Sequence, residues 1–350
     1  MIFDSHAHLL DPAFDRDREA LLSRLPGEGV CAVTEIGFDL ESSRRAAEFS
    51  EKQLSLRQGP EGGSGAEAGL EIYAAVGLHP DYAADCSDEV VRELSELSLR
   101  KGVAAIGEVG LDYYHLDKRS PSQREEAVRA KGEFLRLQRE LLLRREEREQ
   151  LLREKEPGEE ELLSFVPGGE ELSALSLSKK SYRALRELSE SVDFSYAPEP
   201  EIQKSCYLRM IELALFRGLP IVIHSRESAR DSYELLRDSG GYKNSGIVHC
   251  FSYPLEVARQ FAELGMYLGI GGVLTFPNAK KLRRLVAELP LSMMVLETDS
   301  PYLSPLPHRG ERNNPAHLRY VVRALSEIKG IREEEVIRIT AENARAVYRI

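Results

Sequence analysis

Eight short apolar runs recur along the chain, and segments with helical periodicity, such as Leu255–Leu264 and Ala279–Leu289, separate many of them. Several runs are almost uniformly apolar, as expected of parallel strands that are buried on both faces. Eight such strands alternating with helices predict a (β/α)8 barrel, the TIM barrel. The runs are Ile2–His6, Val30–Ile36, Ile72–Val76, Val103–Gly107, Leu219–His224, Gly246–His249, Met266–Ile270 and Met293–Leu296.

The chain is longer than such a barrel needs. A barrel of this kind usually takes about 250 residues, whereas this chain has 350. We assign the surplus to a charged helical insertion over residues 119–198, after the fourth strand, and the barrel to 1–118 and 199–350. The insertion is a solvated ornament, a helical hairpin that binds an unidentified protein partner, or a lid over the active site. A Gly-rich stretch, Gln58–Gly69, is predicted to be a surface loop.

Residues of the metal-binding types stand where the predicted strands end. His6 and His8 form an H-x-H, and alternation along an extended chain puts both imidazoles on one side. In a β/α barrel the carboxyl ends of all strands lie on one rim, the face that holds active sites. Residues far apart in the sequence are therefore expected to converge. The predicted set is His6, His8, Glu108, His224, His249 and Asp299.

This set of ligands predicts two divalent metal ions, Mg, Mn or Zn. Imidazole and carboxylate suit zinc and manganese, and magnesium where more oxygen ligands are present. Four histidines and two carboxylates are more than one ion ordinarily needs, and ions about 3.5–4 Å apart stabilise both oxygens of a displacement at phosphorus. Taken alone, each of these residues is explained as well by ordinary packing of a polar side chain at a strand end as by metal binding. Taken together they favour a site, since packing selects Leu, Ile or Val there.

Composition limits the compartment and the partners. The net charge of −11 argues against a protein that coats nucleic acid by counterion release, but not against an enzyme that meets phosphates through metal ions. No signal peptide is recognisable, and no apolar run approaches the ~20 residues of a membrane helix. The four cysteines lack C-x-x-C spacing, which indicates neither a disulfide framework nor a thiolate zinc site. We therefore expect a cytoplasmic protein without a membrane partner.

Nine motifs, in order from one end of the chain to the other, match a known family. On these motifs the chain resembles the TatD family of metal-dependent deoxyribonucleases, whose members have amidohydrolase-like barrels. The resemblance covers nearly the whole chain outside the two insertions. The motifs are FDSHAHL (Phe3–Leu9), VGLHP (Val76–Pro80), IGEVGLDYY (Ile106–Tyr114), LPIVIHSRES (Leu219–Ser228), IVHCFS (Ile247–Ser252), YLGIGGVLTF (Tyr267–Phe276), LETDSPYLSP (Leu296–Pro305), PHRGERNNP (Pro307–Pro315) and TAENARAVY (Thr340–Tyr348).

The resemblance implies a division of the ligands between two ions. By position, one ion would be held by His6, His8, Glu108 and Asp299, and the other by Glu108, His224 and His249, with Glu108 bridging. His79 would lie near the scissile phosphate and bind substrate or stabilise the transition state. The family includes magnesium-dependent exonucleases that trim DNA from its 3′ end, and relatives with D-aminoacyl-tRNA deacylase activity. It therefore implies metal-dependent hydrolysis more firmly than it implies a substrate.

Two departures from the family pattern stand out. Glu108 and His224 are 116 positions apart, of which about 80 belong to the insertion, far more than an ordinary connection. Asn314 stands where relatives often carry Glu. Neither departure affects a predicted ligand.

Other residues are assigned roles with an alternative beside each. Asp299 is the predicted general base, and Glu297 either orients a metal-binding histidine or is a buried structural carboxylate. Three arginines are candidate phosphate contacts or else surface ion pairs: Arg226, Arg309 and Arg312. Two tyrosines, Tyr113 and Tyr114, are candidate stacking faces for a base or else core residues. Gly271-Gly272 is interpreted as a close approach of the backbone or a tight turn at the end of the seventh strand, and Cys250 as a packing residue.

Three hypotheses about function follow. The first is a divalent-metal deoxyribonuclease, a 3′-5′ exonuclease that acts on single-stranded DNA or 3′ ends. The second is a metal-dependent amide or ester hydrolase such as a D-aminoacyl-tRNA deacylase. The third is a scaffold that binds a partner through the insertion. Retention of all six ligand-type residues counts against the third.

Overall fold

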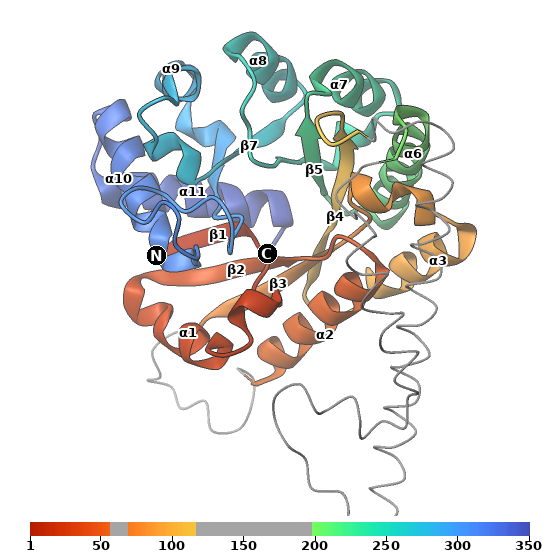
Figure 1. The fold of residues 1–350 in the computed structure, drawn as a ribbon, viewed down its shortest axis with the longest axis horizontal. Helices are drawn as coiled ribbons and strands as arrows, with labels where there is room; N and C mark the ends of the chain where they lie inside the picture. The colour runs from red at the N-terminus through yellow and green to blue at the C-terminus, as the bar shows by residue number, and fades with distance from the viewer. Residues whose placement is uncertain (57–68, 117–197) are drawn as a thin grey trace, which may run out of the picture. The chain divides into compact units, whose positions relative to one another are not determined.

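The structure, a computed structural model of the chain, describes residues 1–56, 69–116 and 198–350. Its eight strands form one sheet in sequence order, every neighbouring pair parallel, and helices surround them (Figure 1). The predicted (β/α)8 barrel is confirmed. The strands are β1 (Ile2–Ala7), β2 (Val30–Ile36), β3 (Glu71–Val76), β4 (Val103–Asp112), β5 (Ile221–Arg226), β6 (Gly246–Val248), β7 (Met266–Ile270) and β8 (Met294–Leu296).

Both helices that were predicted by residue range within the barrel are present. Leu255–Leu264 is α8 and Ala279–Leu289 is α9, each within a residue of its predicted ends. The predicted insertion lies outside the described residues except for Pro198, and so does the predicted loop except for Gly69. No helix in the described ranges is long and apolar enough to cross a membrane. The α-helices are α1 (Arg18–Arg24), α2 (Leu40–Leu56), α3 (Asp88–Leu97), α6 (Pro200–Arg217), α7 (Ala229–Asp238), α8 (Leu255–Glu263), α9 (Lys280–Glu288), α10 (Leu318–Lys329) and α11 (Glu333–Tyr348).

Hydrogen bonds between the first strand and the residues after the last strand close the barrel. The Asp299 N–H donates to the His6 carbonyl at 2.9 Å. Thr298 donates to the buried Asp4 carboxylate from its N–H at 2.9 Å and its hydroxyl at 2.5 Å. Burial raises the pKa of Asp4 to about 7, against the opposing effect of the Thr298 bonds. Closure therefore holds Asp299 beside the H-x-H of β1.

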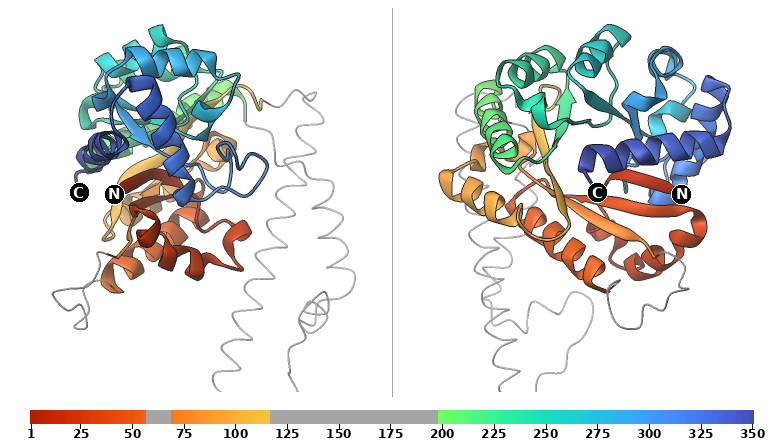
Figure 2. Two further views of the ribbon diagram at one scale, coloured as in Figure 1. Left: turned by 90° about the vertical axis from the view of Figure 1, so that its left-hand side faces the viewer. Right: turned by 180° about the vertical axis from the view of Figure 1, so that it is seen from behind.

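Helix α11 closes the amino-terminal end of the barrel. It lies across that end in the rear view of Figure 2. Tyr348, near its end, is stacked on Phe3 with ring centroids 5.9 Å apart, and its hydroxyl donates to the Ser5 carbonyl at 2.7 Å. Small residues such as Ala32 and Ala105 fill the interior next to these rings. Because this end is packed shut, the opposite mouth is left for a site.

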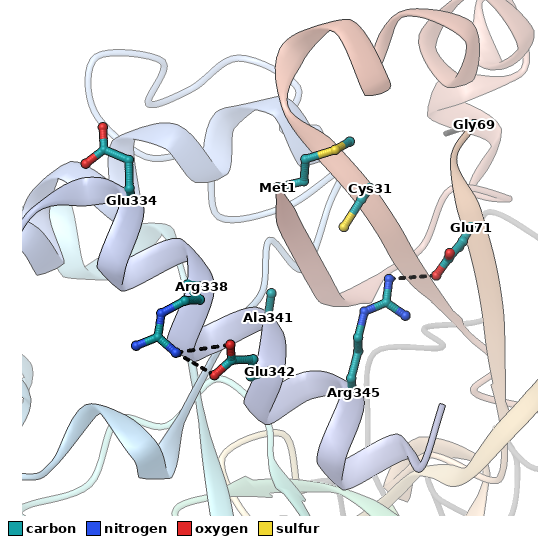
Figure 3. Close-up of a pocket in the computed structure, with 9 residues that line it drawn as sticks. All are labelled: Met1, Cys31, Gly69, Glu71, Glu334, Arg338, Ala341, Glu342 and Arg345. Carbon is teal, nitrogen blue, oxygen red and sulfur yellow. Dashed lines mark hydrogen bonds and ion pairs between the residues drawn. The ribbon is translucent and has the colours of Figure 1, made fainter. Parts of the chain in front are cut away.

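A cavity of about 420 Å³ lies between α11 and the first residues of β1 to β3 (Figure 3). Four of its charged side chains pair with one another: Arg345 with Glu71 and Arg338 with Glu342, each at 2.8 Å. None of the predicted metal ligands lines this cavity. Most of the charges that line this cavity are paired within the chain, and we assign no chemistry to it.

Strand β4 is longer than predicted, and this changes the place of Glu108. The prediction ended the strand at Gly107, whereas β4 continues to Asp112 with Glu108 inside it. Pairing with β5 steps from Ile106 opposite Ile221 to Val109 opposite Ile223, so β4 carries one extra residue beside Glu108. Such a bulge re-aims a side chain. The apolar pattern breaks at Glu108, which is why periodicity ended the strand too early.

Gly110 allows β4 and β5 to approach closely. Its φ is +139°, and a Cβ there would lie 2.0 Å from the backbone oxygen of His224. We predict that Gly110→Ala lowers the free energy of unfolding by at least about 2 kcal/mol, because backbone atoms cannot yield as a flexible side chain does. Urea unfolding measures this.

Gly27→Ala is the matched control, because a Cβ at Gly27 meets no atom within 4 Å. Its free energy of unfolding should change by no more than about 0.5 kcal/mol. Equal stability of the two variants would contradict the described packing of β4 on β5.

Candidate metal centre

The six predicted ligands and His79 meet at the carboxyl end of the barrel. His6 lies in β1 and is buried, and the other residues line a cavity of about 350 Å³. This is the end opposite α11, where the strands of a β/α barrel carry active sites. The cavity is lined by His8, Asp11, Phe38, His79, Asp81, Tyr82, Glu108, His224, His249, Asp299 and Tyr302.

Glu108 lies at the centre of the cluster. Its Oε1 is 2.8 Å from Nδ1 of His224 and 3.7 Å from Nε2 of His249, and its Oε2 is 3.5 Å from Nε2 of His6. Burial alone would raise the pKa of Glu108, but the charge of His249 and the bond with His224 hold that pKa well below its ordinary range. The carboxylate is therefore ionised. Its Oε2 faces His6, and its Oε1 faces His224 and His249.

His6, His8 and Asp299 form a second side of the cluster. Oδ1 of Asp299 is 3.7 Å from Nε2 of His6 and 3.5 Å from Nε2 of His8. These separations exceed an ordinary hydrogen bond. They are close to the roughly 3 to 3.5 Å between two atoms that each lie about 2.1 Å from one ion.

His6 gives the strongest indication that a cation belongs here. Within the described part of the chain, neither of its buried ring nitrogens has a hydrogen-bond partner. A buried polar atom without a partner is costly. Burial lowers the pKa of His6, which favours the neutral ring, and the neutral ring is the form that binds metals. The residues present therefore fit a divalent metal ion.

Glu297 contacts the far side of His249. Its Oε1 lies 3.2 Å from Nδ1 of His249 and accepts the Cys250 N–H at 2.5 Å. Its carboxylate is packed against Gly269, where a Cβ would lie 2.0 Å from Oε2. A carboxylate in this place orients the ring and raises the basicity of its other nitrogen. The contact supports the first of the two predicted roles of Glu297.

Asp112 makes the equivalent contact with His224, and the sequence analysis did not single it out. Its buried Oδ2 lies 3.1 Å from Nε2 of His224 and 2.7 Å from Nδ1 of His115. The signal was present, since Glu108, Gly110 and Asp112 alternate on one face of a strand. It was missed because the strand was taken to end at Gly107.

His79 forms part of the cavity wall through the loop after β3. Its ring meets the His224 ring edge-on, with centroids 4.4 Å apart. The Asp81 N–H donates to Nδ1 of His79 at 3.3 Å, and Oδ2 of Asp81 lies 3.3 Å from the same nitrogen. The cavity also contains Phe38, Tyr82 and Tyr302, which the sequence analysis missed because they lie in loops or in a short 3-10 helix, where no apolar periodicity marks them.

Apart from His79, the predicted substrate contacts lie outside the cavity lining. The Tyr113 hydroxyl donates to Asp231 at 2.7 Å, whereas Tyr114 is 50 % exposed, with the Arg226 guanidinium 4.1 Å from its ring centroid. Arg309 is likewise exposed and lies 4.7 Å from the ring centroid of Phe276.

Three further residues have structural roles. Arg312 makes a two-pronged ion pair with Asp17, at 2.6 and 2.7 Å. A Cβ on Gly272 would lie 2.2 Å from the Leu303 carbonyl oxygen, which confirms the predicted close approach. Asn314 is buried and caps the turn that begins at Pro315.

Cys250 is close to His249 and Asp299, and the three together have metal-binding atoms within 4.8 Å of one another. Burial raises the pKa of the Cys250 thiol to about 12. A protonated thiol is a poor ligand, since the thiolate is the form that binds metal. This agrees with the interpretation of Cys250 as a packing residue.

A parallel β/α barrel with imidazoles and carboxylates gathered at its carboxyl mouth defines a metal-dependent hydrolase. The chain belongs to the TatD family: the family model described as TatD related DNase matches residues 3–141 and 190–349. The resemblance seen in the sequence motifs is confirmed.

Relatives agree with this assignment. The chain is 31% identical to the uncharacterized metal-dependent hydrolase YabD of Bacillus subtilis, over all of both chains. It is 30% identical to the uncharacterized metal-dependent hydrolase TatD of Mycobacterium tuberculosis, over 99% of this chain and 97% of the relative. The crystal structure of the TatD homologue YjjV of Escherichia coli has the same fold, with a TM-score of 0.66 and 22% identity over 100% of this chain and 98% of that one.

We predict that Glu297→Gln weakens metal binding about 10- to 100-fold, the usual effect of removing a carboxylate behind a metal-binding histidine. Calorimetric titration of the metal-stripped protein with Mn²⁺ measures this. The control is Glu71→Gln at the other end of the barrel, which loses its pair with Arg345 and should bind Mn²⁺ as the unaltered protein does. Unchanged affinity in Glu297→Gln would show that Glu297 does not position His249.

Proposed function

We propose that this TatD-family hydrolase cleaves phosphodiester bonds of DNA and removes nucleotides from 3′ ends of single strands. The observation that carries the proposal is the arrangement around Glu108, whose two oxygens face His6 on one side and His224 and His249 on the other. A carboxylate so placed suits a bridge between two cations. Paired cations suit displacement at phosphorus.

The ligands of the two cations are proposed as follows. His6, His8, Glu108 and Asp299 hold one divalent ion, and Glu108, His224 and His249 hold the other, with Mg²⁺, Mn²⁺ or Zn²⁺ as the candidates. When bound, such ions stabilise negative charge at the phosphorus and lower the pKa of water.

The chain's own side chains would then orient substrate and move protons. Asp299 accepts the proton of the attacking water, because its partly buried carboxylate belongs to the cluster and lies at the cavity wall. His79 donates a hydrogen bond from Nε2 to a phosphoryl oxygen and so stabilises the charge that develops there. Glu297 and Asp112 keep the His249 and His224 rings in place.

The dimensions of the site support a terminal, single-stranded substrate. At about 350 Å³, the cavity is at the small end of ligand sites, which span about 300–1,000 Å³. It suits one nucleotide better than a duplex. The family resemblance supplies the 3′-to-5′ polarity, and the free thiols suit the cytoplasm, where we place the enzyme.

Tyr114 and Arg226 are the proposed contacts for the rest of the strand. They stand at the ends of β4 and β5, the strands that carry Glu108 and His224. The guanidinium lies over the Tyr114 ring, so the pair offers an aromatic face to a base and a cation to a phosphate. Arg309 beside Phe276 is a second pair of this kind, after β8 and β7.

We predict that end-labelled single-stranded DNA is shortened from its 3′ end by the purified protein, and that EDTA abolishes the activity until Mg²⁺ or Mn²⁺ is added in excess. Asp299→Asn should lower the rate at least about 100-fold, since it removes the proton acceptor. This variant, purified identically, also controls for contaminating nuclease.

Two results would contradict the proposal: cleavage that persists in EDTA, or equal cleavage by Asp299→Asn. Hydrolysis of D-aminoacyl-tRNA without cleavage of DNA would replace it with the ester-hydrolase alternative.

Substrate contacts make a separate prediction. Stacking of one base is worth about 1–3 kcal/mol, so Tyr114→Ala should raise KM for a single-stranded oligonucleotide by about 5- to 150-fold. KM for bis(p-nitrophenyl) phosphate, which has no bases, should stay unchanged. Tyr113→Phe is the control, because it loses only the hydroxyl bonded to Asp231. Equal effects of Tyr114→Ala on both substrates would exclude the stacking role.

A further inference from the structure

Two cysteines that the function does not use lie side by side outside the metal centre. Cys86 directly follows the short helix η3 (Pro80–Asp85), and Cys206 lies in α6. Their thiols are neighbours, and each shifts the pKa of the other. The chain has four cysteines, all free thiols. The thiol of Cys31, in contrast, is bonded to the Ile2 carbonyl.

The contact between these cysteines does not depend on the thiols alone. Arg209, one helical turn after Cys206, donates to the Cys86 carbonyl at 2.6 Å and pairs with Asp88 at 2.5 Å. Helix α6 packs along η3 and contacts α3, and Figure 1 shows α6 beside α3. Because the Arg209 guanidinium bonds the Cys86 carbonyl one helical turn from Cys206, it holds Cys86 against the part of α6 that carries Cys206.

The two thiols differ in exposure and in reactivity. Cys86 is partly exposed, whereas Cys206 is 3 % exposed. The neighbouring Cys206 thiol lowers the pKa of Cys86, against the effect of burial and with help from the charge of Arg209. The Cys206 pKa is raised, first by the Cys86 thiol and then by burial. Cys86 is thus the accessible nucleophile, and Cys206 is the thiol beside it.

We infer that Cys86 and Cys206 form a redox-modification site, a dithiol that a peroxide oxidises to a disulfide between η3 and α6. The Cys86 thiolate attacks a peroxide oxygen, the O–O bond breaks, and Cys86 becomes a sulfenic acid while hydroxide leaves and takes up a proton. The Cys206 sulfur then attacks the Cys86 sulfur. The S–S bond forms and the sulfenic oxygen leaves as water with the Cys206 proton. Two thiols lose two electrons and two protons, and hydrogen peroxide is reduced to two waters.

The bond would couple two walls of the metal centre. Helix η3 begins after His79, and its Tyr82 lines the cavity. On α6, Gln203 holds the backbone of Asp112, accepting its N–H at 2.8 Å and donating to its carbonyl at 3.0 Å. The disulfide therefore links the segment of His79 to the helix that supports Asp112. Cytosolic disulfides of this kind are transient and form under oxidising conditions.

The experiment treats the full-length reduced protein with hydrogen peroxide, alkylates the remaining thiols, and maps unreduced peptides by mass spectrometry. We expect one crosslinked pair that contains Cys86 and Cys206, a fall in free thiols from four to two, and full reversal by dithiothreitol. Cys31→Ser is the matched control and should leave the crosslink unchanged. Cys86→Ser should abolish it.

Cys206→Ala gives a second readout that does not depend on the crosslink. In this variant Cys86 should stop at sulfenic acid, which dimedone traps, and circular dichroism checks that the fold is retained. The inference is overturned if all four thiols survive in the unaltered protein, if Cys31 or Cys250 enters crosslinks as readily, or if Cys86 is oxidised to sulfinic acid without joining Cys206.

Discussion

The site depends on one buried carboxylate surrounded by imidazoles. Glu108 is 4 % exposed and lies within 3.7 Å of His6, His224 and His249. A buried charge is unfavourable unless it is paired, so this carboxylate belongs in the barrel only with cationic or metal partners around it. The bulge of β4 turns it inward, and the glycine at position 110 lets β5 approach closely enough to bring His224 within 2.8 Å.

The rest of the barrel keeps these groups in place. Bonds from Thr298 to Asp4 and from Asp299 to the His6 carbonyl tie the last strand to the first. Buried carboxylates behind the cluster contact the histidines from outside, Glu297 at His249 and Asp112 at His224. Helix α11 seals the opposite end. The chemistry is thus confined to one mouth, and the groups around it are held by contacts that do not themselves involve substrate.

Much of this arrangement can be predicted from the sequence, for two physical reasons. Strands buried on both faces are uniformly apolar, so the eight strands could be placed within one or two residues except at the end of β4. Parallel strands end on one rim, so His6, His249 and Asp299 could be expected to meet although they lie far apart in the chain. Periodicity says nothing about loops and short 3-10 helices, and for this reason Phe38, Tyr82 and Tyr302 were missed in the cavity wall.

Contacts between elements that lie far apart in the sequence were not predicted either. The extra residue in β4 hid Asp112 from the pattern, because the strand was taken to end before it. Cys86 and Cys206 show no sequence spacing that indicates a pair, and only the packing of η3 on α6 brings them together. Such pairings follow from tertiary packing rather than from local preference.

The proposed pair of metal ions around Glu108 is tested most directly by anomalous diffraction from crystals of the protein soaked in Mn²⁺. We expect two peaks at the carboxyl mouth of the barrel, one beside His6, His8 and Asp299 and the other beside His224 and His249, with one oxygen of Glu108 bound to each. A single peak, or two peaks with Glu108 bound to neither, would contradict it.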